Sequence, residues 1–195
     1  MVIDPATDDA VVLATQTWLE RAVIGLSLCP FAKAVHAKGQ IRYVASHAET
    51  AEALLPDLQA ELTALSAAAP ELIETTLLIV PRALADFLEY NAFLRRADAL
   101  LEKLGLVGTL QIASFHPQYE FGDSQSTDVE NCSNRSPYPT LHLLREASVS
   151  RAVAAFPDAA QIFEKNRATL RELGHEGFLR VLAGEATSPK ATSST

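Results

Sequence analysis

The chain has 195 residues, of which 48% are hydrophobic and 21% charged, and its formal net charge at pH 7 is -8. This length and balance suit one globular domain with a substantial core. The negative charge argues against general binding to nucleic acid or to an anionic membrane, because phosphate contacts need clustered Lys and Arg, although it leaves room for a local cationic pocket.

The N-terminus and the cysteine usage both indicate a protein that is not exported. The first ten residues, MVIDPATDDA, are acidic and lack the basic and then apolar pattern of a signal peptide. No apolar run approaches the roughly 18 residues that a membrane-spanning helix needs. Cys29 and Cys132 are too few and too far apart for a disulfide framework. The sequence therefore predicts a reduced, cytoplasmic protein without a membrane partner.

Apolar periodicity predicts an alternation of helices and strands along the chain. Two prolines modify this pattern: Pro30 restarts a helix, and Pro56 marks a late start or a kink. In chain order, we expect a helix over 8–28, a short helix from Pro30 to Gly39, a strand over 41–45, a helix over 48–68, a strand over 72–80, a helix over 82–104, a strand over 106–115, helices over 141–155 and 159–173 with Gly174 as a stop, and a short strand or helical turn over 178–182.

This order favours an α/β fold, because strands joined by helical crossovers of twenty-odd residues pair in parallel. We expect a layered sandwich in which helices flank a small, mostly parallel sheet of three or more strands. An antiparallel α+β arrangement, ferredoxin-like, is the alternative. Residues 1–183 are expected to form a single globular domain, and the polar residues 184–195 a disordered tail.

A polar stretch from Ser114 to Glu146 lies between the last predicted strand and the following helix. A loop of this length is usually functional or disordered. The aromatic residues Phe115, Tyr119, Phe121 and Tyr138 indicate that it is ordered, because disordered segments are poor in aromatics. Ligands of open α/β sheets bind beyond the carboxyl ends of strands, which is where this loop begins. The sequence therefore predicts the functional site here.

The arginines of this stretch predict anion recognition, because guanidinium groups offer a planar fork of donors to carboxylate or phosphate. In the predicted helix, His142, Arg145 and Glu146 would share one face. The competing interpretation is that the arginines pair with acidic residues and only hold the loop in place. The residues that we expect to bind a small anionic molecule are Arg42, Tyr119, Asn131, Asn134, Arg135, Tyr138, His142, Arg145 and Glu146.

Two residues are candidates for catalysis, His116 and Cys29. His116 stands at a strand end and could act as a general acid or base, with His142 as the alternative. Cys29 precedes Pro30, where a helix N-terminus would lower the pKa of the thiol. A structural hydrogen-bonding histidine and a buried structural cysteine are the competing interpretations. A transient disulfide between Cys29 and Cys132 is a further option.

The sequence also contains the residue types of a metal site with two histidines and one carboxylate, namely His116, Asp123, Asp128, Glu130 and His142. No HxH, HExxH or paired-cysteine spacing accompanies them, so we assign no metal ligand and no cofactor. No GxGxxG, GxxxxGK[ST] or GxSxG motif occurs either, which leaves nucleotide loops and a hydrolase nucleophile elbow without support.

Five segments of the chain resemble a bacterial family that is catalogued as domain of unknown function 1415. They are LCPFAK (28–33), TTLLIVP (75–81), DFLEYNAFL (86–94), LQIASFHPQYEF (110–121) and NRSPYPTLHLLREASV (134–149). The resemblance runs from about Arg21 to Leu173 and implies a single-domain bacterial protein, but no activity.

The residues themselves predict an enzyme that acts on a small anionic metabolite, phosphorylated or carboxylated, by His-based acid/base chemistry. A non-catalytic module that senses a ligand or binds a partner is one alternative. A metal-dependent enzyme is another.

Overall fold

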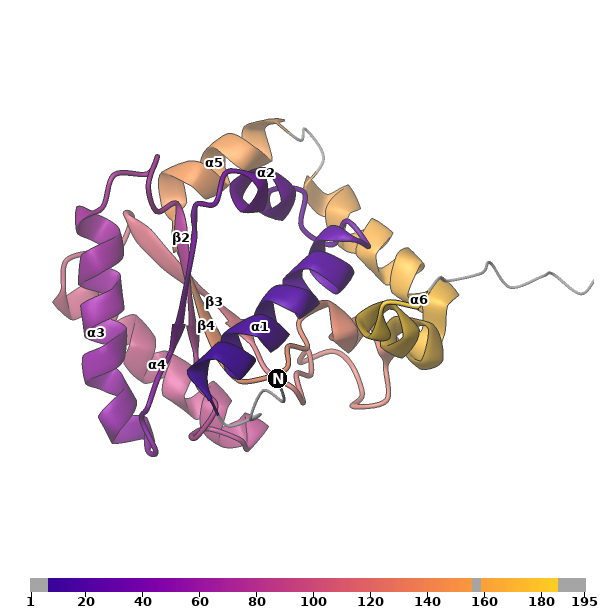
Figure 1. Ribbon diagram of the computed structural model, residues 1–195, viewed down its shortest axis with the longest axis horizontal. Helices are drawn as coiled ribbons and strands as arrows, with labels where there is room; N and C mark the ends of the chain where they lie inside the picture. Colours follow the sequence, from indigo (N-terminus) through magenta and orange to yellow (C-terminus); the bar gives the residue numbers. More distant parts are fainter. Residues whose placement is uncertain (1–6, 156–158, 186–195) are drawn as a thin grey trace, which may run out of the picture.

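A four-stranded sheet with helices on both faces forms the centre of the computed structural model, which describes residues 7–155 and 159–185 (Figure 1). The strands are β1 (Ile41–Ala45), β2 (Thr75–Ile79), β3 (Leu110–Phe115) and β4 (Thr140–Arg145). Their order is β1-β2-β4-β3. Of the three hydrogen-bonded pairs of this sheet, β1–β2 is parallel, whereas β4 is antiparallel to both of its neighbours. The prediction of an α/β sandwich is confirmed, but the sheet is mixed: it is neither mostly parallel nor the antiparallel sheet of the alternative.

The helices largely follow the predicted segments, and side chains at three of their N-termini explain where they begin. Thr7, Thr50 and Asp86 each accept a hydrogen bond from a backbone amide of the first turn. Within the described ranges, no helix is both long enough and apolar enough to cross a membrane. The helices are α1 (Asp8–Trp18), its π-helical continuation η1 (Leu19–Ile24), α2 (Ala32–Ala37), α3 (Ala51–Ala67), α4 (Phe87–Lys103), the 3₁₀ helix η2 (Val129–Ser133), α5 (Glu146–Ala155) and α6 (Ala159–Ala183).

Two breaks that the sequence predicts differ in the structure. Pro56 lies inside α3, so the late start is wrong, whereas the kink stays a prediction. At Gly174 the backbone leaves the helical region with a φ of 63°, but the helix resumes and takes in residues 178–182. The short strand predicted there is therefore wrong, and the helical-turn alternative is right. The predicted tail falls mostly on residues 186–195, which lie outside the described residues.

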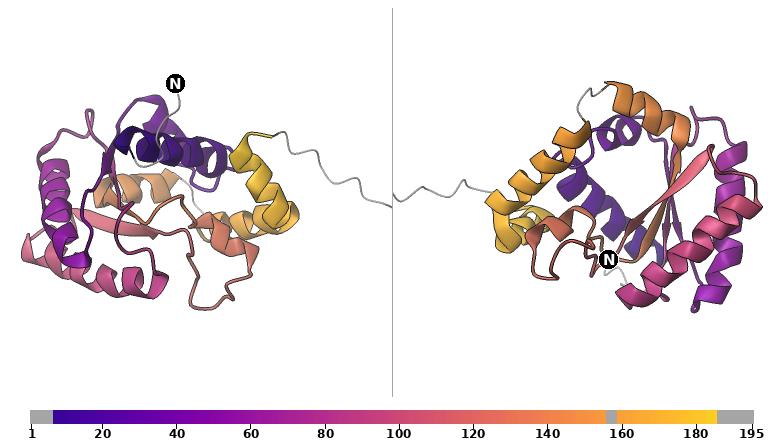
Figure 2. Two further views of the ribbon diagram at one scale, coloured as in Figure 1. Left: turned by 60° about the horizontal axis from the view of Figure 1, so that its bottom comes forward. Right: turned by 180° about the vertical axis from the view of Figure 1, so that it is seen from behind.

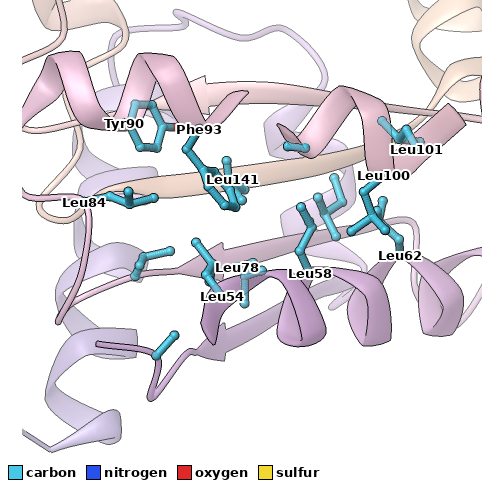
Figure 3. Packing of buried hydrophobic residues seen from close by; sticks show 14 of the residues in the cluster. Leu54, Leu58, Leu62, Leu78, Leu84, Tyr90, Phe93, Leu100, Leu101 and Leu141 are labelled. Atoms are coloured by element: carbon cyan, nitrogen blue, oxygen red, sulfur yellow. The ribbon is translucent and has the colours of Figure 1, made fainter. Parts of the chain in front are cut away.

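The two faces of the sheet carry separate helical layers. Helices α3 and α4 cover one face, and α1 and α6 lie on the other side (Figures 1 and 2). Leu54, Leu58 and Leu62 of α3 pack with Leu78 and Leu141 of the sheet in the core of the first face (Figure 3). This burial supplies the main driving force for the α3–sheet–α4 half of the molecule.

The segment after the long loop is the central strand β4, where the sequence predicted the start of a helix. Leu141 and Leu143 point into the core beneath α3 and α4, so His142 faces the opposite side of the sheet. The same alternation puts His142 and Arg145 on opposite faces, and the predicted shared face of His142, Arg145 and Glu146 is wrong. Pairing with strands on both sides outweighs the local helical periodicity, and the helix starts only at Glu146.

A π-helical turn connects α1 to the segment that carries Cys29. The amide of Gly25 donates to the carbonyl of Glu20, and the amide of Leu28 donates to that of Val23, each across five residues. A Cβ atom on Gly25 would lie 2.2 Å from the carbonyl oxygen of Arg21. Glycine is therefore required here. Such turns are rare in proteins and are frequent at functional sites.

Candidate functional site

A cavity of about 370 Å³ opens between η1, the long loop and α6. This volume is in the range of small-molecule sites. Its apolar lining residues are Val23, Leu28, Phe115, Phe121, Phe163 and Leu170. Its polar lining residues are Cys29, Asp123, Ser124, Asp128, Glu130, Ser133, Asn134, Asn166, Arg167 and Arg171.

Helix α6 supplies the cationic wall of the cavity. Glu130 of η2 accepts a hydrogen bond from Nε of Arg171 and lies 3.9 Å from Nε of Arg167. Backbone hydrogen bonding and the Arg171 guanidinium lower the pKa of Glu130, which stays ionised. Asn166 donates to the carbonyl of Leu28 at 2.8 Å and ties α6 to the segment before Cys29. The wall is thus fastened to both η2 and the N-terminal segment.

Two of the predicted site residues, Cys29 and Asn134, line this cavity. Cys29 is a free, half-buried thiol. Helix α2 starts at Ala32 rather than at Pro30, so Cys29 lies just before the helix and not at its first turn. Cys132 is buried elsewhere, with its sulfur 3.8 Å from Nδ1 of His175. Cys29 is therefore the accessible thiol of the cavity.

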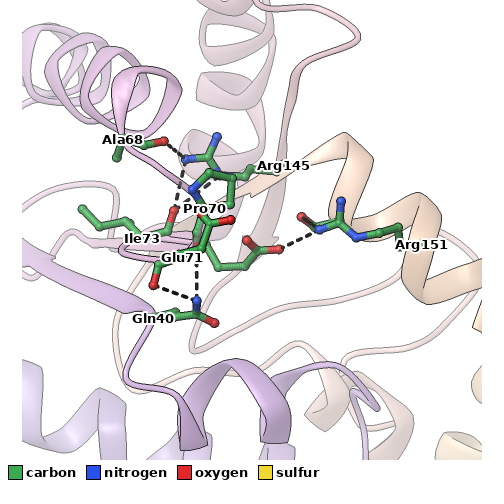
Figure 4. Close-up of polar contacts among 9 residues, drawn as sticks. Gln40, Ala68, Pro70, Glu71, Ile73, Arg145 and Arg151 are labelled. Atoms are coloured by element: carbon green, nitrogen blue, oxygen red, sulfur yellow. Dashed lines mark hydrogen bonds and ion pairs between the residues drawn. The ribbon is translucent and has the colours of Figure 1, made fainter.

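The three arginines predicted to bind an anion all bond protein groups instead. Arg42 forms a two-point ion pair with Glu61 of α3, at 2.8 and 3.1 Å. Arg135 donates to the carbonyl of Tyr119 at 3.2 Å and to that of Ser126 at 2.7 Å. Arg145 donates to carbonyls at the end of α3, as Figure 4 shows. None of the three lines the cavity. They hold the structure, as the competing interpretation has it, but Arg135 and Arg145 bond backbone carbonyls rather than acidic residues.

Asn131 organises the long loop from within. Its side chain is fully buried. Its Oδ1 accepts from the amide of Phe121 at 3.1 Å and from the hydroxyl of Ser124 at 2.8 Å, and its Nδ2 donates to the carbonyl of Gln125 at 2.7 Å. With the amide occupied in this way, Asn131 shapes the loop around the cavity rather than facing a ligand.

The remaining residues predicted to bind a ligand lie outside the cavity lining. The Tyr119 ring packs against the ring of Phe121, with the centroids 5.0 Å apart. The carbonyl of Tyr138 accepts from the hydroxyl of Thr140 at 2.9 Å. Glu146 begins α5. The contacts of Tyr119 and Tyr138 stabilise the loop and the start of β4.

His116 is fully buried and bonds the backbone through both ring nitrogens. Its Nδ1 accepts from the amide of Gln118 at 3.0 Å, so its Nε2 carries the proton and donates to the carbonyl of Leu84 at 3.0 Å. Leu84 has a φ of 57°, in the left-handed region. Burial lowers the pKa of His116. Its geometry leaves no nitrogen for a substrate and fits a structural histidine that holds the Leu84 turn.

His142 lies on the cavity side of the sheet, and its ring is 6.0 Å from that of Phe115. The hydroxyl of Thr75 contacts both Nε2 of His142, at 2.7 Å, and the carbonyl of Leu143, at 2.6 Å. A carbonyl can only accept, so Thr75 donates to Leu143 and His142 Nε2 donates to Thr75. The proton of His142 therefore lies on Nε2, and because burial lowers its pKa to about 4, the ring is neutral at pH 7.

This lowered pKa predicts a stability that decreases in acid. The unfolded chain binds a proton at His142 below its ordinary pKa of about 6.5, whereas the folded chain binds it only near pH 4. The free energy of unfolding therefore has its highest value above pH 6.5 and falls by about 2 kcal/mol as the pH is lowered to 4. The decrease is smaller than the pKa shift alone would give, because solvent still reaches part of this half-buried residue. Urea unfolding at pH 7, 5.5 and 4 measures it. The free energy of unfolding of His142→Gln should decrease less than that of the wild type over this range, and His116 accounts for part of the decrease that remains. A decrease as large as that of the wild type would show that His142 is not its cause.

The residues of the metal alternative do not come together. Among the residues that the structure describes, no three His, Cys, Asp or Glu side chains lie close enough to hold a metal ion. His116 is enclosed by backbone contacts, and His142 lies on the face of a strand. The carboxylates of Asp123, Asp128 and Glu130 line the cavity without either histidine.

Sequence reasoning missed the contribution of α6. Phe163, Arg167 and Arg171 recur every four residues and therefore share one helical face. This spacing was a usable signal, because a core-facing stripe does not carry two arginines.

The fold and the cavity define an α/β protein with a mixed four-stranded sheet and a small-molecule-sized cavity between its loop and its C-terminal helix. A family model for proteins of unknown function, DUF1415, matches residues 10–180. The chain belongs to this family, as its five segments predicted. No curated protein and no solved structure matches the chain significantly.

Proposed function

We propose that this protein is an enzyme that binds a small anionic molecule in the α6 cavity and reacts with it through Cys29. One observation carries the proposal: a single cavity is lined both by a free thiol and by two arginines, Arg167 and Arg171. In this proposal Arg167 and Arg171 bind the anion in place of the loop arginines. Cys29 is the reactive group in place of His116.

Arg171 is the better oriented of the two cations. Glu130 accepts from its Nε, and no other hydrogen bond or ion pair of this side chain is found among the described residues. Its two terminal nitrogens are therefore available as donors, while Glu130 fixes the direction of the guanidinium. A guanidinium oriented in this way binds carboxylate or phosphate in two-point fashion.

Cys29 supplies the nucleophile in this proposal. A thiolate attacks electrophilic carbon or phosphorus centres more readily than the hydroxyl of a serine does at neutral pH. The alternative is a non-catalytic module that senses the same ligand, and it needs the arginines but not the thiol. Cys29→Ser separates the two, because it abolishes turnover in an enzyme and leaves binding intact in either case.

The binding part of the proposal predicts a thermal shift. A ligand at one hundred times its dissociation constant stabilises a protein by about 2.7 kcal/mol, which is several degrees for a chain of this size. We expect phosphorylated or carboxylated small molecules to raise the melting temperature of the wild type but not of Arg171→Met. Arg135→Met is the control: the loop arginine lies outside the cavity lining, so it should keep the shift even if its own melting temperature is lower. A shift that survives Arg171→Met but is lost in Arg135→Met would contradict the proposal.

A further inference from the structure

We infer that the ligand of this cavity carries a single anionic group on an aromatic ring. The inference rests on the proposed function and adds the chemical class of the ligand. Three phenylalanine rings, Phe115, Phe121 and Phe163, line the cavity beside the two arginines. Phe163 is 48% exposed although it is a large apolar side chain. The ring therefore presents part of its surface to the cavity, where a flat ligand can pack against it.

Neighbouring aromatic side chains hold these rings in fixed orientations. Phe121 packs edge-on against Phe163, with the centroids 6.5 Å apart and the planes at 89°. Tyr119 supports Phe121 from behind, at 5.0 Å. Trp18 supports Phe115 in the same way, at 5.2 Å. Rings that are already oriented lose little freedom on binding and favour a flat partner.

The spacing between the rings and the cations limits how far the anionic group can lie from the ring of the ligand. The guanidinium of Arg167 lies 5.3 Å from the centre of the Phe163 ring. Arg171 follows one helical turn later on the same face of α6, which corresponds to about 6 Å. A ring that packs against Phe163 therefore presents to Arg167 a group attached directly to that ring. Arg171 lies beside Arg167, because the Nε atoms of both arginines contact the same carboxylate oxygen of Glu130.

The loop side of the cavity carries negative charge. Asp123 and Asp128 line it together with Glu130, so the wall carries three carboxylates against two guanidinium groups. A ligand with several anionic groups would place at least one of them against these carboxylates and be repelled. An aromatic ring with one anionic group fits better, because the edge of the ring is electropositive and can lie towards the carboxylates.

The experiment compares ligands that differ only in the flatness of the ring. Isothermal titration calorimetry with benzoate and cyclohexanecarboxylate keeps the charge and nearly the size constant, and acetate reports the anion alone. We expect benzoate to bind the wild type about tenfold more tightly than cyclohexanecarboxylate. In Phe163→Leu this preference should fall to about twofold or less. Because about half of the Phe163 side chain is exposed, the variant should lose only a few degrees of melting temperature through its contacts with Phe121 and Arg167.

Two results would overturn the inference alone: equal affinities for the flat and the saturated ring, or a preference for benzoate that survives Phe163→Leu. Either leaves the proposed function standing, because an anion still binds. If none of the three carboxylates and no inorganic phosphate binds, the proposed function fails and the inference fails with it. Binding of benzoate that is lost in Arg171→Met would support both.

Discussion

Replacing Gly25 with Ala is expected to lower the free energy of unfolding by about 3 kcal/mol or more, because the new methyl group would collide with backbone. It would lie 2.2 Å from the carbonyl oxygen of Arg21 and 3.3 Å from that of Glu20. The carbonyl of Glu20 accepts the hydrogen bond from the amide of Gly25, so the backbone cannot shift away from the new methyl group without disturbing the π-helical turn. That turn positions Val23, Leu28 and the cysteine beyond them, so the substitution should also disturb the cavity.

A second glycine provides the matched control. A Cβ atom on Gly122 would meet no atom within 4 Å, and its backbone is not in the left-handed region. We therefore expect Gly122→Ala to change the unfolding free energy by about 0.5 kcal/mol or less. Urea unfolding of both variants measures the contrast. If Gly25→Ala is as stable as Gly122→Ala, the π-helical turn is not required for the fold.

Arg145→Met is expected to cost about 3 kcal/mol of unfolding free energy, because it removes a charged hydrogen-bonding group from a helix end. One terminal nitrogen of Arg145 donates to the carbonyls of Leu65, Ala68 and Ile73, at 2.7, 2.6 and 3.1 Å. These oxygens lie at and just beyond the C-terminus of α3, where the helix leaves carbonyls without partners. Methionine keeps the aliphatic stem and isolates the loss of the guanidinium.

Arg151→Met is the control in the same region (Figure 4). Arg151 forms a 3.4 Å ion pair with Glu74, but its side chain is 68% exposed. Such a pair contributes about 0–1 kcal/mol. Arg145→Lys should fall between the two methionine variants, because a single ammonium cannot reproduce the fork. Equal costs for Arg145→Met and Arg151→Met, measured by chemical denaturation, would show that Arg145 does not cap α3.

The layered fold could be predicted from the sequence wherever periodicity and end signals agree. The buried run around Leu77, the long amphipathic helix after Asp86 and the stop at Gly105 each combine a pattern with a terminus signal. The direction of the strands could not be predicted in the same way. The spacing of Leu141, Leu143 and Leu144 is compatible with either period, and pairing of this segment with β2 on one side and β3 on the other decides in favour of a strand.

The site was predicted in part, because residue type does not reveal which partner a side chain finds. The loop arginines have the chemistry of anion binders, but the chain brings backbone carbonyls to Arg135 and Arg145. Cys29 was named for its place before a helix, and it lines the cavity although that helix starts later. Arg171 becomes part of the site only because α6 folds back onto η2, a contact that no local pattern records.

The rate at which Cys29 is alkylated tests the central claim, that an anion binds beside this thiol, most directly. Iodoacetamide labelling followed by mass spectrometry resolves the two cysteines. We expect Cys29 to react and buried Cys132, whose thiol pKa is raised by burial, to react far more slowly. Saturating benzoate or inorganic phosphate should slow the labelling of Cys29 by about tenfold or more in the wild type and not in Arg171→Met. An unchanged rate with both anions at saturating concentration would contradict the account.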